Sequence, residues 1–297
     1  MSLEMNNEEK NKRLAEVVAL VNNSQLSSIK AIVSGIINII NDPKSTVKDL
    51  KDIIELDPPL TARLLARANS AYYGSPKKIS EIEQAVIWIG FDALKELALS
   101  QKVCEIFDKD EFIHGYSRAS LWKHSIAVAL LGKMVYRRKF RQMGESAYIA
   151  GLLHDIGIIV EDQFLQEDFK NILLKSKDEE KNLSKAEDEV LGYNHAEVGK
   201  ALMDDWGLPQ ELVIAIGHHN YPNVDNEFSR ITSTIFIAEY VCQEIGYCDV
   251  PFTDERFFNK HLKDLDVETH ALELIVKAVK NEISEMEDKG LFASEKN

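Results

Sequence analysis

Residues with the ligand chemistry of a metal site are concentrated in the second half of this 297-residue sequence. His154 and Asp155 are adjacent in the segment GLLHDIG, and His218 and His219 form a second adjacent pair. Neighbouring residues diverge by about 100° on a helix, so both members of a pair reach one ion only near a helix end or beside a second ion. The candidate metal pocket consists of His124, His154, Asp155, His195, His218 and His219.

Neutral imidazoles and a carboxylate form a mixed nitrogen and oxygen ligand set that suits iron, manganese, zinc or nickel. One or two such ions could polarise a phosphoryl oxygen or activate a water molecule. The alternative for any single histidine is a satisfied core or surface residue, and His114, His261 and His270 are assigned to that class. A third interpretation is a metal-free hydrogen-bonded network, in which an unpaired buried group would cost about 1–3 kcal/mol.

Helices must position these side chains, because apolar residues recur at spacings of three and four almost throughout the chain. Alternating runs typical of strands are nearly absent, so the sequence predicts an all-α fold. Helix breaks are expected at residues 41–43, at residues 57–59 and at Gly90, where proline or glycine interrupts the pattern. Ser80 and Glu83 have the spacing of a capping box for the helix that follows them.

The pattern divides the chain into four expected segments. Residues 1–22 should form a leader and a first helix, and residues 23–115 an N-terminal helical lobe. Residues 116–250 should form the lobe with the candidate pocket, and residues 251–297 C-terminal helices that pack on it. The charged stretch at 108–112 marks the expected boundary between the two lobes.

The composition limits the expected partners and location. Lys and Arg number 35 and Asp and Glu 49, and the resulting net charge of −14 would repel a phosphate backbone, so nucleic acid is not expected. The N-terminus lacks the apolar segment of a signal peptide, and no apolar run is long enough to span a membrane. Cys104, Cys242 and Cys248 have neither zinc-knuckle nor disulfide-framework spacing. We expect a cytoplasmic protein with reduced thiols.

A basic run offers the weak candidates for substrate binding, Arg137 and Arg138, because guanidinium groups pair bidentately with phosphate. The run consists of Lys133, Arg137, Arg138, Lys139 and Arg141. The alternative interpretation is a solvated helix end.

The order and context of the pocket residues resemble those of the HD phosphohydrolase superfamily. The first lobe sharpens this resemblance: DPPLTARLL at 57–65, ANSAY at 68–72 and IEQAV at 82–86, followed by Gly90, are similar to the HDOD domain. This HD-related output domain of bacterial signalling implies a multi-helical HD-domain-like core with an N-terminal helical lobe. It also implies a regulatory role with an unidentified signalling protein as partner and a nucleotide or phosphate as candidate ligand.

The resemblance implies a ligand role for the pocket residues and adds Glu239, which stands where the superfamily has its final aspartate. Many HDOD members have lost the HD ligands, whereas this sequence keeps them. A glutamate can still ligate, but its extra methylene requires a shift of the backbone or of the ion.

Two departures weigh against catalysis. Active cyclic-dinucleotide phosphodiesterases of the HD-GYP type have a lysine soon after HDIG, where this chain has Ile158. Their GYP loop is replaced here by residues 220–222, Asn-Tyr-Pro. No catalytic residue is therefore assigned. The sequence favours a regulatory signal-transduction protein with a retained metal site, and the alternative is a metal-dependent phosphohydrolase acting on a nucleotide or another phosphoester.

Overall fold

A computed structural model gives the fold of the chain. The residues that it describes are 6–24, 26–107, 114–179, 181–222, 227–248 and 255–288. Within these ranges all the regular elements are helices, which confirms the predicted all-α class. The chain divides into two compact units, the larger comprising residues 1–24 and 109–279 and the smaller residues 25–108 and 280–297. No described helix combines the length and the apolar character that crossing a membrane requires.

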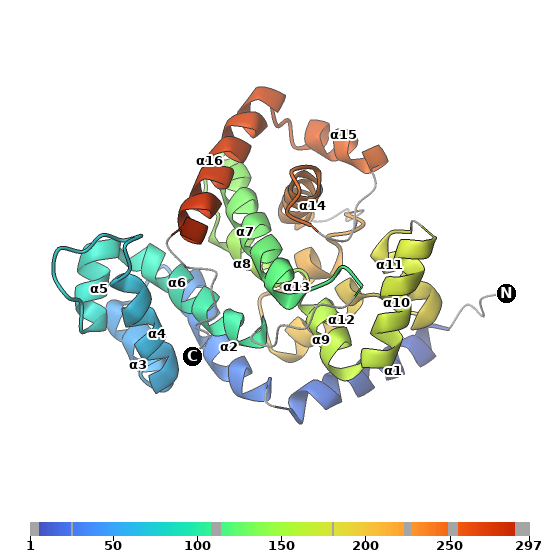
Figure 1. Cartoon of the computed structure of the whole chain (residues 1–297), viewed down its shortest axis with the longest axis horizontal. Helices are drawn as coiled ribbons and strands as arrows, with labels where there is room; N and C mark the ends of the chain where they lie inside the picture. The colour runs from blue at the N-terminus through green and yellow to red at the C-terminus, as the bar shows by residue number, and fades with distance from the viewer. Residues whose placement is uncertain are drawn as a thin grey trace. The chain divides into compact units, whose positions relative to one another are not determined.

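The helices of the smaller unit follow the breaks expected from proline and glycine. They are α2 (Ser27–Asn41), α3 (Val47–Ile54), α4 (Pro58–Ala68), α5 (Ile82–Ile89) and α6 (Phe91–Cys104), which continues as a 3₁₀ turn, Glu105–Phe107. Helix α2 packs on α3 and α6, and α4 packs on α5 and α6 (Figure 1). Gly90 separates α5 from α6 at a φ of +90°, a conformation that favours glycine.

A cluster of balanced charges, which we call the Lys102 cluster, holds α4 against α6. Asp57, the N-cap of α4, accepts a hydrogen bond from the Leu60 amide at 3.0 Å and pairs with the ammonium of the buried Lys102. Lys102 also pairs with Glu105 at 2.8 Å, and Glu105 pairs with Arg63. Burial would raise the pKa of Asp57, but the bond from Lys102 lowers it below its ordinary value. Two cations therefore meet two anions.

The predicted capping box of Ser80 and Glu83 is wrong. Helix α5 has Glu81 as its N-cap, without a capping bond from that side chain. Gln84 Oε1 instead accepts a hydrogen bond from the Ser80 amide at 2.9 Å, and Glu83 pairs with Lys51 of α3 at 2.7 Å. The helix starts one residue later than the pattern suggested, so the glutamate points to a neighbouring helix.

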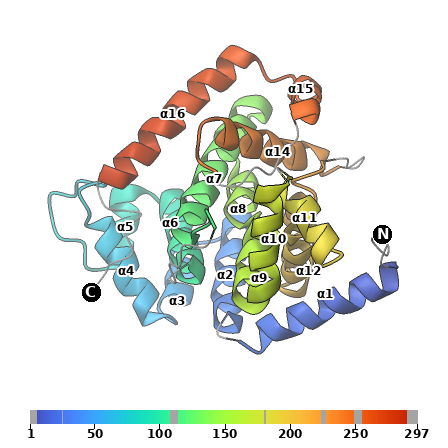
Figure 2. The same cartoon turned by 45° about the vertical axis from the view of Figure 1, so that its right-hand side comes forward.

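The larger unit consists of the long helix α7 and a set of mostly shorter helices. They are α1 (Asn7–Asn22), α7 (Arg118–Phe140), α8 (Glu145–Leu153), α9 (Ile156–Phe164), α10 (Gln166–Asp178), α11 (Leu183–Val190), α12 (His195–Asp205), α13 (Gln210–Gly217), α14 (Ser229–Glu244) and α15 (Glu255–Asp264), with α16 (Thr269–Asp288) beginning in this unit. Helix α7 packs on α8 and α14, and α12 packs on α9, α13 and α1. Figure 2 shows α1 running beside α12 and α9.

Two glycines allow the helices that carry the candidate ligands to approach closely. A Cβ atom on Gly151 of α8 would lie 2.7 Å from the Ala129 Cα atom of α7. A Cβ atom on Gly157 of α9 would lie 2.0 Å from the carbonyl oxygen of His195 at the start of α12. Real Cβ atoms do not tolerate such distances, so both glycines of GLLHDIG are required for close packing. Gly157 in particular allows the segment that follows Asp155 to pack against the start of α12.

Candidate metal centre

Six of the seven predicted ligand side chains converge in the interior of the larger unit. His124 lies within α7 and Glu239 within α14, whereas the other four stand at helix ends. His154 is the C-cap of α8 and Asp155 the N-cap of α9, so both residues of the adjacent pair face inwards at the junction between two helices. His195 is the first residue of α12, and His219 follows the end of α13.

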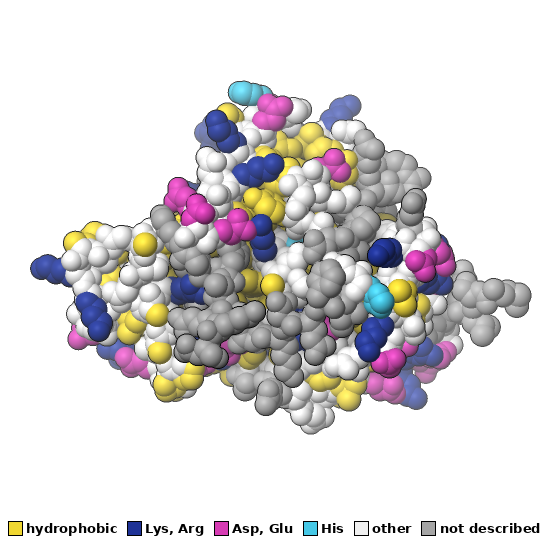
Figure 3. Space-filling model, viewed as in Figure 1, with side chains coloured by type: hydrophobic (Ala, Val, Ile, Leu, Met, Phe, Trp, Pro, Cys, Tyr) yellow, Lys and Arg dark blue, Asp and Glu magenta, His cyan; other side chains and the backbone are white. Residues whose placement is uncertain are grey.

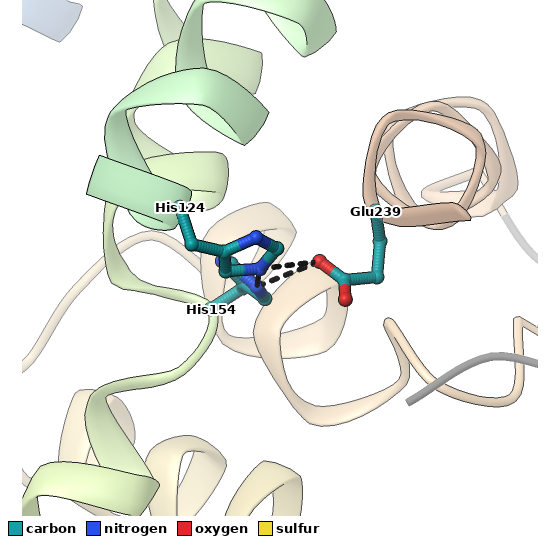
Figure 4. Close-up of side chains that lie close together, drawn as sticks. All are labelled: His124, His154 and Glu239. Atoms are coloured by element: carbon teal, nitrogen blue, oxygen red, sulfur yellow. Dashed lines mark hydrogen bonds and ion pairs between the residues drawn. The ribbon is translucent and has the colours of Figure 1, made fainter. Parts of the chain in front are cut away.

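The first subsite is formed by His124, His154 and Glu239 (Figure 4). Glu239 Oε2 lies 2.9 Å from His124 Nε2 and 3.0 Å from His154 Nε2, and the two imidazole nitrogens are 3.3 Å apart. Figure 4 shows α7 and α14 presenting His124 and Glu239 from opposite sides. The longer glutamate thus reaches the histidine pair from its own helix.

Asp155 lies between the first subsite and a second one. Its Oδ2 atom is 3.1 Å from His154 Nε2 and 3.5 Å from His124 Nε2. Its Oδ1 atom is 3.5 Å from both His195 Nε2 and His219 Nε2, which are 3.3 Å from each other. We call His195, His219 and Asp155 Oδ1 the second subsite. One carboxylate therefore faces both halves of the centre.

The other ring nitrogen of each imidazole already has a partner. Nδ1 donates to a backbone carbonyl in three cases: Tyr247 for His124 at 2.9 Å, Gly151 for His154 at 2.8 Å, and Ile216 for His219 at 2.7 Å. In a neutral imidazole the proton on Nδ1 leaves the Nε2 lone pair free to ligate. Partners of this kind orient histidine ligands in metal proteins. The Nε2 atoms of these three histidines therefore face the carboxylate of Asp155.

His195 has a carboxylate in place of the carbonyl. Its Nδ1 atom lies 2.7 Å from Glu187 Oε2, and its backbone amide donates to the same oxygen at 2.9 Å. Burial lowers the pKa of His195, but Glu187 raises it above its ordinary value, which makes Nε2 a stronger base and a better ligand.

A second buried glutamate, Glu161 of α9, lies beside Glu187. Burial and then the charge of Glu187 raise the pKa of Glu161 well above its ordinary value. The raised pKa favours the protonated form of Glu161, and in that form Glu161 and Glu187 carry one negative charge between them.

The buried carboxylates of Asp155 and Glu239 supply the test of fit for a cation. Neither oxygen of either group makes a hydrogen bond of ordinary geometry, and the nearest polar atoms are imidazole nitrogens. Buried carboxylates without hydrogen bonds are costly unless a cation neutralises them. The donor set of imidazole nitrogens and carboxylate oxygens suits a first-row divalent ion. The residues present therefore fit a metal.

Protons compete with any cation for these groups. Burial lowers the pKa of His154, but Asp155 and Glu239 outweigh it and raise this pKa to about 10. Burial raises the pKa of Glu239, yet the charges of His124 and His154 lower it to about 2. Without a metal, protonated imidazole therefore balances the carboxylates, and metal uptake would release that proton.

The centre is closed to solvent. Its six residues have relative accessibilities of at most 1%: His124, His154, Asp155, His195, His219 and Glu239. This burial bears on function, because catalytic metal sites keep a position open for water and substrate, whereas structural sites are closed by protein ligands.

Two groups of predicted site residues lie away from the centre. His218 is half-buried and lines a cavity of about 450 Å³ together with Lys200, whose Nζ atom is 3.5 Å from His218 Nε2. Arg137 and Arg138 line grooves between α7 and α16. They stand 13 and 14 residues beyond His124, which corresponds to roughly 20 Å along a helix. On the face shown in Figure 3, the coloured Lys and Arg side chains are interspersed with Asp and Glu.

Sequence reasoning missed Glu187, Glu161 and Asn220 as parts of the centre. Asn220 Nδ2 lies 2.9 Å from His195 Nε2 and 2.9 Å from Ser184 Oγ, which places this amide next to the second subsite. The acidic residues around Glu187 have the pattern of an ordinary exposed helix, so nothing in the sequence pointed to the contact between Glu187 and His195. The placement of Asn220 directly after the histidine pair was a signal that could have been used.

The HDOD domain model matches residues 26–222, which include the smaller unit's helices and the candidate ligands up to His219. The chain belongs to the HDOD domain family. An uncharacterized protein of Treponema pallidum (strain Nichols) is 26% identical over 229 residues, covering 74% of this chain and 43% of that protein. The chain therefore spans less than half the length of this relative.

Several solved structures share the fold. An HDOD domain protein from Geobacter sulfurreducens is similar with a TM-score of 0.74 and 25% identity, over 89% of this chain and 92% of that one. A candidate signal transduction protein from Marinobacter aquaeolei VT8 has a TM-score of 0.78 and 20% identity, over 99% and 68%. A candidate phosphohydrolase from Shewanella amazonensis SB2B has a TM-score of 0.68 and 21% identity, over 94% and 96%.

Proposed function

We propose that this HDOD protein is a cytoplasmic regulatory component of bacterial signal transduction that acts by binding a signalling protein, and that its larger unit contains a structural metal centre. The proposed ligands are His124, His154, Asp155, His195, His219 and Glu239. They would hold one or two ions of iron, manganese, zinc or nickel. When bound, the metal would supply positive charge that neutralises the buried carboxylates of Asp155 and Glu239.

The burial of the ligands is the observation that carries this proposal. Every proposed ligand is at most 1% accessible, so the described conformation offers no exposed coordination position for a phosphoester. The chain also has the apolar Ile158, which is 1% accessible, where a phosphate-binding lysine would follow HDIG. A buried ion at this point would instead join α7, α14 and the α8–α9 junction.

The alternative is a metal-dependent phosphohydrolase, and the position of Asp155 favours it. The two oxygens of this carboxylate face different histidine pairs, as a carboxylate shared by two ions would. Two ions held in this way can activate a water molecule and stabilise the charge that develops on a phosphoryl group. This reaction would require the centre to open.

Elemental analysis and a hydrolysis assay on the purified full chain separate these functions. We expect bound transition metal in the wild-type protein and its loss in His154→Ala, with no metal-dependent turnover of nucleotides or of bis(p-nitrophenyl) phosphate. His270→Ala is the control, because this histidine is exposed and lies outside the centre. Robust turnover that disappears in Asp155→Ala would establish the hydrolase instead. A chain that neither contains nor takes up metal would be the hydrogen-bonded network alone.

A further inference from the structure

The second subsite is occupied by a protein group. Asn220 is 4% accessible, and its Nδ2 atom lies 2.9 Å from His195 Nε2, the same nitrogen that would ligate an ion. His195 donates its Nδ1 proton to Glu187, so in the neutral ring Nε2 is an acceptor and the amide must present its NH₂ group to it. A lone pair engaged by this N–H is not available to a metal.

The geometry holds the amide in this position from two sides. Ser184 Oγ, which is fully buried, accepts the second N–H of Asn220 at 2.9 Å. Both donors of the NH₂ group are therefore used, whereas Asn220 Oδ1 is buried without a hydrogen-bond partner. A buried amide oxygen without a hydrogen bond costs free energy, so packing alone does not explain why Asn220 is held against His195.

Among the described residues, the ligand atoms of the first subsite lie next to one another, with Glu239 Oε2 2.9 Å from His124 Nε2 and 3.0 Å from His154 Nε2. The groups whose ligand atoms lie close enough to share an ion are His124, His154 and Glu239 in one case and His154, Asp155 and His219 in the other, and neither contains His195. His219 differs from His195 because its Nδ1 atom donates to the Ile216 carbonyl rather than to a carboxylate. Asn220 thus acts on the second subsite through one nitrogen atom, His195 Nε2.

We propose that Asn220 is a lock on the second subsite: its amide withholds His195 from a second ion, so that the resting centre binds one metal ion tightly and a second only when the amide moves away. Asn220 also lines the cavity of about 450 Å³ that contains Lys200 and His218, so the lock can be reached from outside the metal centre. This inference rests on the proposed metal centre. It implies that movement of Asn220 changes the number of metal ions bound per chain.

The test is a titration of the metal-free full chain with Mn²⁺, followed by isothermal calorimetry and by electron paramagnetic resonance, which distinguishes single ions from spin-coupled pairs. We expect about one ion per wild-type chain at low free Mn²⁺, and about two spin-coupled ions in Asn220→Ala. The Kd of the second ion should fall about tenfold, because one hydrogen bond of ordinary strength no longer has to be broken. Water that replaces the amide is displaced easily.

Three further variants make the result specific. Ser184→Ala removes only the anchor of the amide, so it should shift the second Kd in the same direction by a smaller factor while leaving Asn220 in place. Gln210→Ala is the matched control, because this amide lines the same cavity but donates to Asp204. In a His195→Ala background the Asn220 substitution should have no effect on the second ion.

The outcomes separate the lock from the metal centre itself. A second ion that binds more weakly in Asn220→Ala would make this amide a ligand and overturn the lock. An unchanged second Kd in both Asn220→Ala and Ser184→Ala would also overturn it, with the first ion and the proposed function intact. Failure of the wild-type chain to bind any Mn²⁺, iron, zinc or nickel would instead remove the metal centre on which the lock rests.

Discussion

Asp57 and Asp155 stand at the same position of two helices, as the N-caps of α4 and α9, and use their carboxylates in opposite ways. Asp57 accepts the amide proton of Leu60 and pairs with Lys102, as expected of a capping residue. Asp155 makes no capping bond, and its oxygens face imidazole nitrogens. An aspartate that gives up a cap worth about 1 kcal/mol is placed for another purpose.

The surroundings of the two aspartates explain the difference. The Lys102 cluster contains its own cations, so its charges are balanced by protein side chains alone. The centre around Asp155 contains two carboxylates and no lysine or arginine partner among the described ion pairs, so its positive charge must come from protons or from a metal. Buried charge is thus balanced by protein cations in one unit and leaves two carboxylates that a cation would neutralise in the other.

The largest expected effect comes from metal removal. Chelation should lower the free energy of unfolding by about 4 kcal/mol relative to protein kept at a thousandfold excess of free metal over Kd. Hydrogen exchange read by mass spectrometry should accelerate in α7, α8, α9 and α14. Exchange in α4 and α6 should not respond, because the Lys102 cluster needs no ion.

The matched variants decide whether this comparison holds. Asp155→Ala should abolish the difference between metal-loaded and chelated protein, whereas Lys102→Met should destabilise both forms equally by about 3 kcal/mol, since it removes the buried ammonium that pairs with Asp57 and Glu105. The comparison between the two clusters breaks if metal removal affects Lys102→Met and the wild type differently.

A smaller effect is expected from pH. Burial and Glu187 raise the pKa of Glu161 in the folded state, so the folded chain retains a proton that the unfolded chain releases above about pH 4.3. Stability is therefore lost as pH rises through this range, by about 1.4 kcal/mol per pH unit from this group. Glu161→Gln should remove the loss, and urea unfolding of the metal-free chain at several pH values measures it.

Asp57 provides the opposite sign for this measurement. Its pKa is lowered in the folded state, so its contribution is present above about pH 3.9 and disappears as pH falls further. Asp57→Asn should accordingly matter less in acid than at neutral pH. An Asp57→Asn effect that grows in acid, or a Glu161→Gln profile parallel to that of the wild type, would contradict these assignments.

The all-α fold and most of the residues that converge in the centre could be predicted from the sequence, and the reasons are physical. Proline, glycine and apolar spacing act locally, so helix ends lie at the expected breaks: α4 begins at Pro58, inside the break at 57–59, and α5 ends at Ile89, next to Gly90. Adjacent histidines were assigned together, yet His219 faces the centre and His218 the cavity, because the rotation between neighbours separates them once α13 has ended. The periodicity could not specify which of the two turns inwards.

The environment of each ligand lay beyond the sequence. Glu187 and Glu161 gain their roles from the packing of α9 and α11 against the start of α12, and nothing in their local pattern distinguishes them from solvated residues. Whether the converged side chains hold metal stays a prediction. The position of a glycine can indicate a close contact that composition does not, since Gly157 lies against His195.

A smaller change in stability is expected from removal of the N-cap hydrogen bond, and it compares the two aspartates directly. In chelated protein, Asp57→Ala should destabilise the chain about 1 kcal/mol more than Asp57→Asn, because asparagine still accepts the Leu60 amide proton. The corresponding Asp155→Ala and Asp155→Asn variants should show no such difference at the start of α9, where Ile158 donates to the backbone carbonyl of Asp155. Amide exchange at Leu60 and Ile158 reads each cap directly: protection of Leu60 should fall in Asp57→Ala alone, and protection of Ile158 should be alike in both Asp155 variants. Loss of Ile158 protection in Asp155→Ala but not in Asp155→Asn would mean that Asp155 caps its helix as Asp57 does, and the case for a carboxylate reserved for a cation would then lose its structural basis.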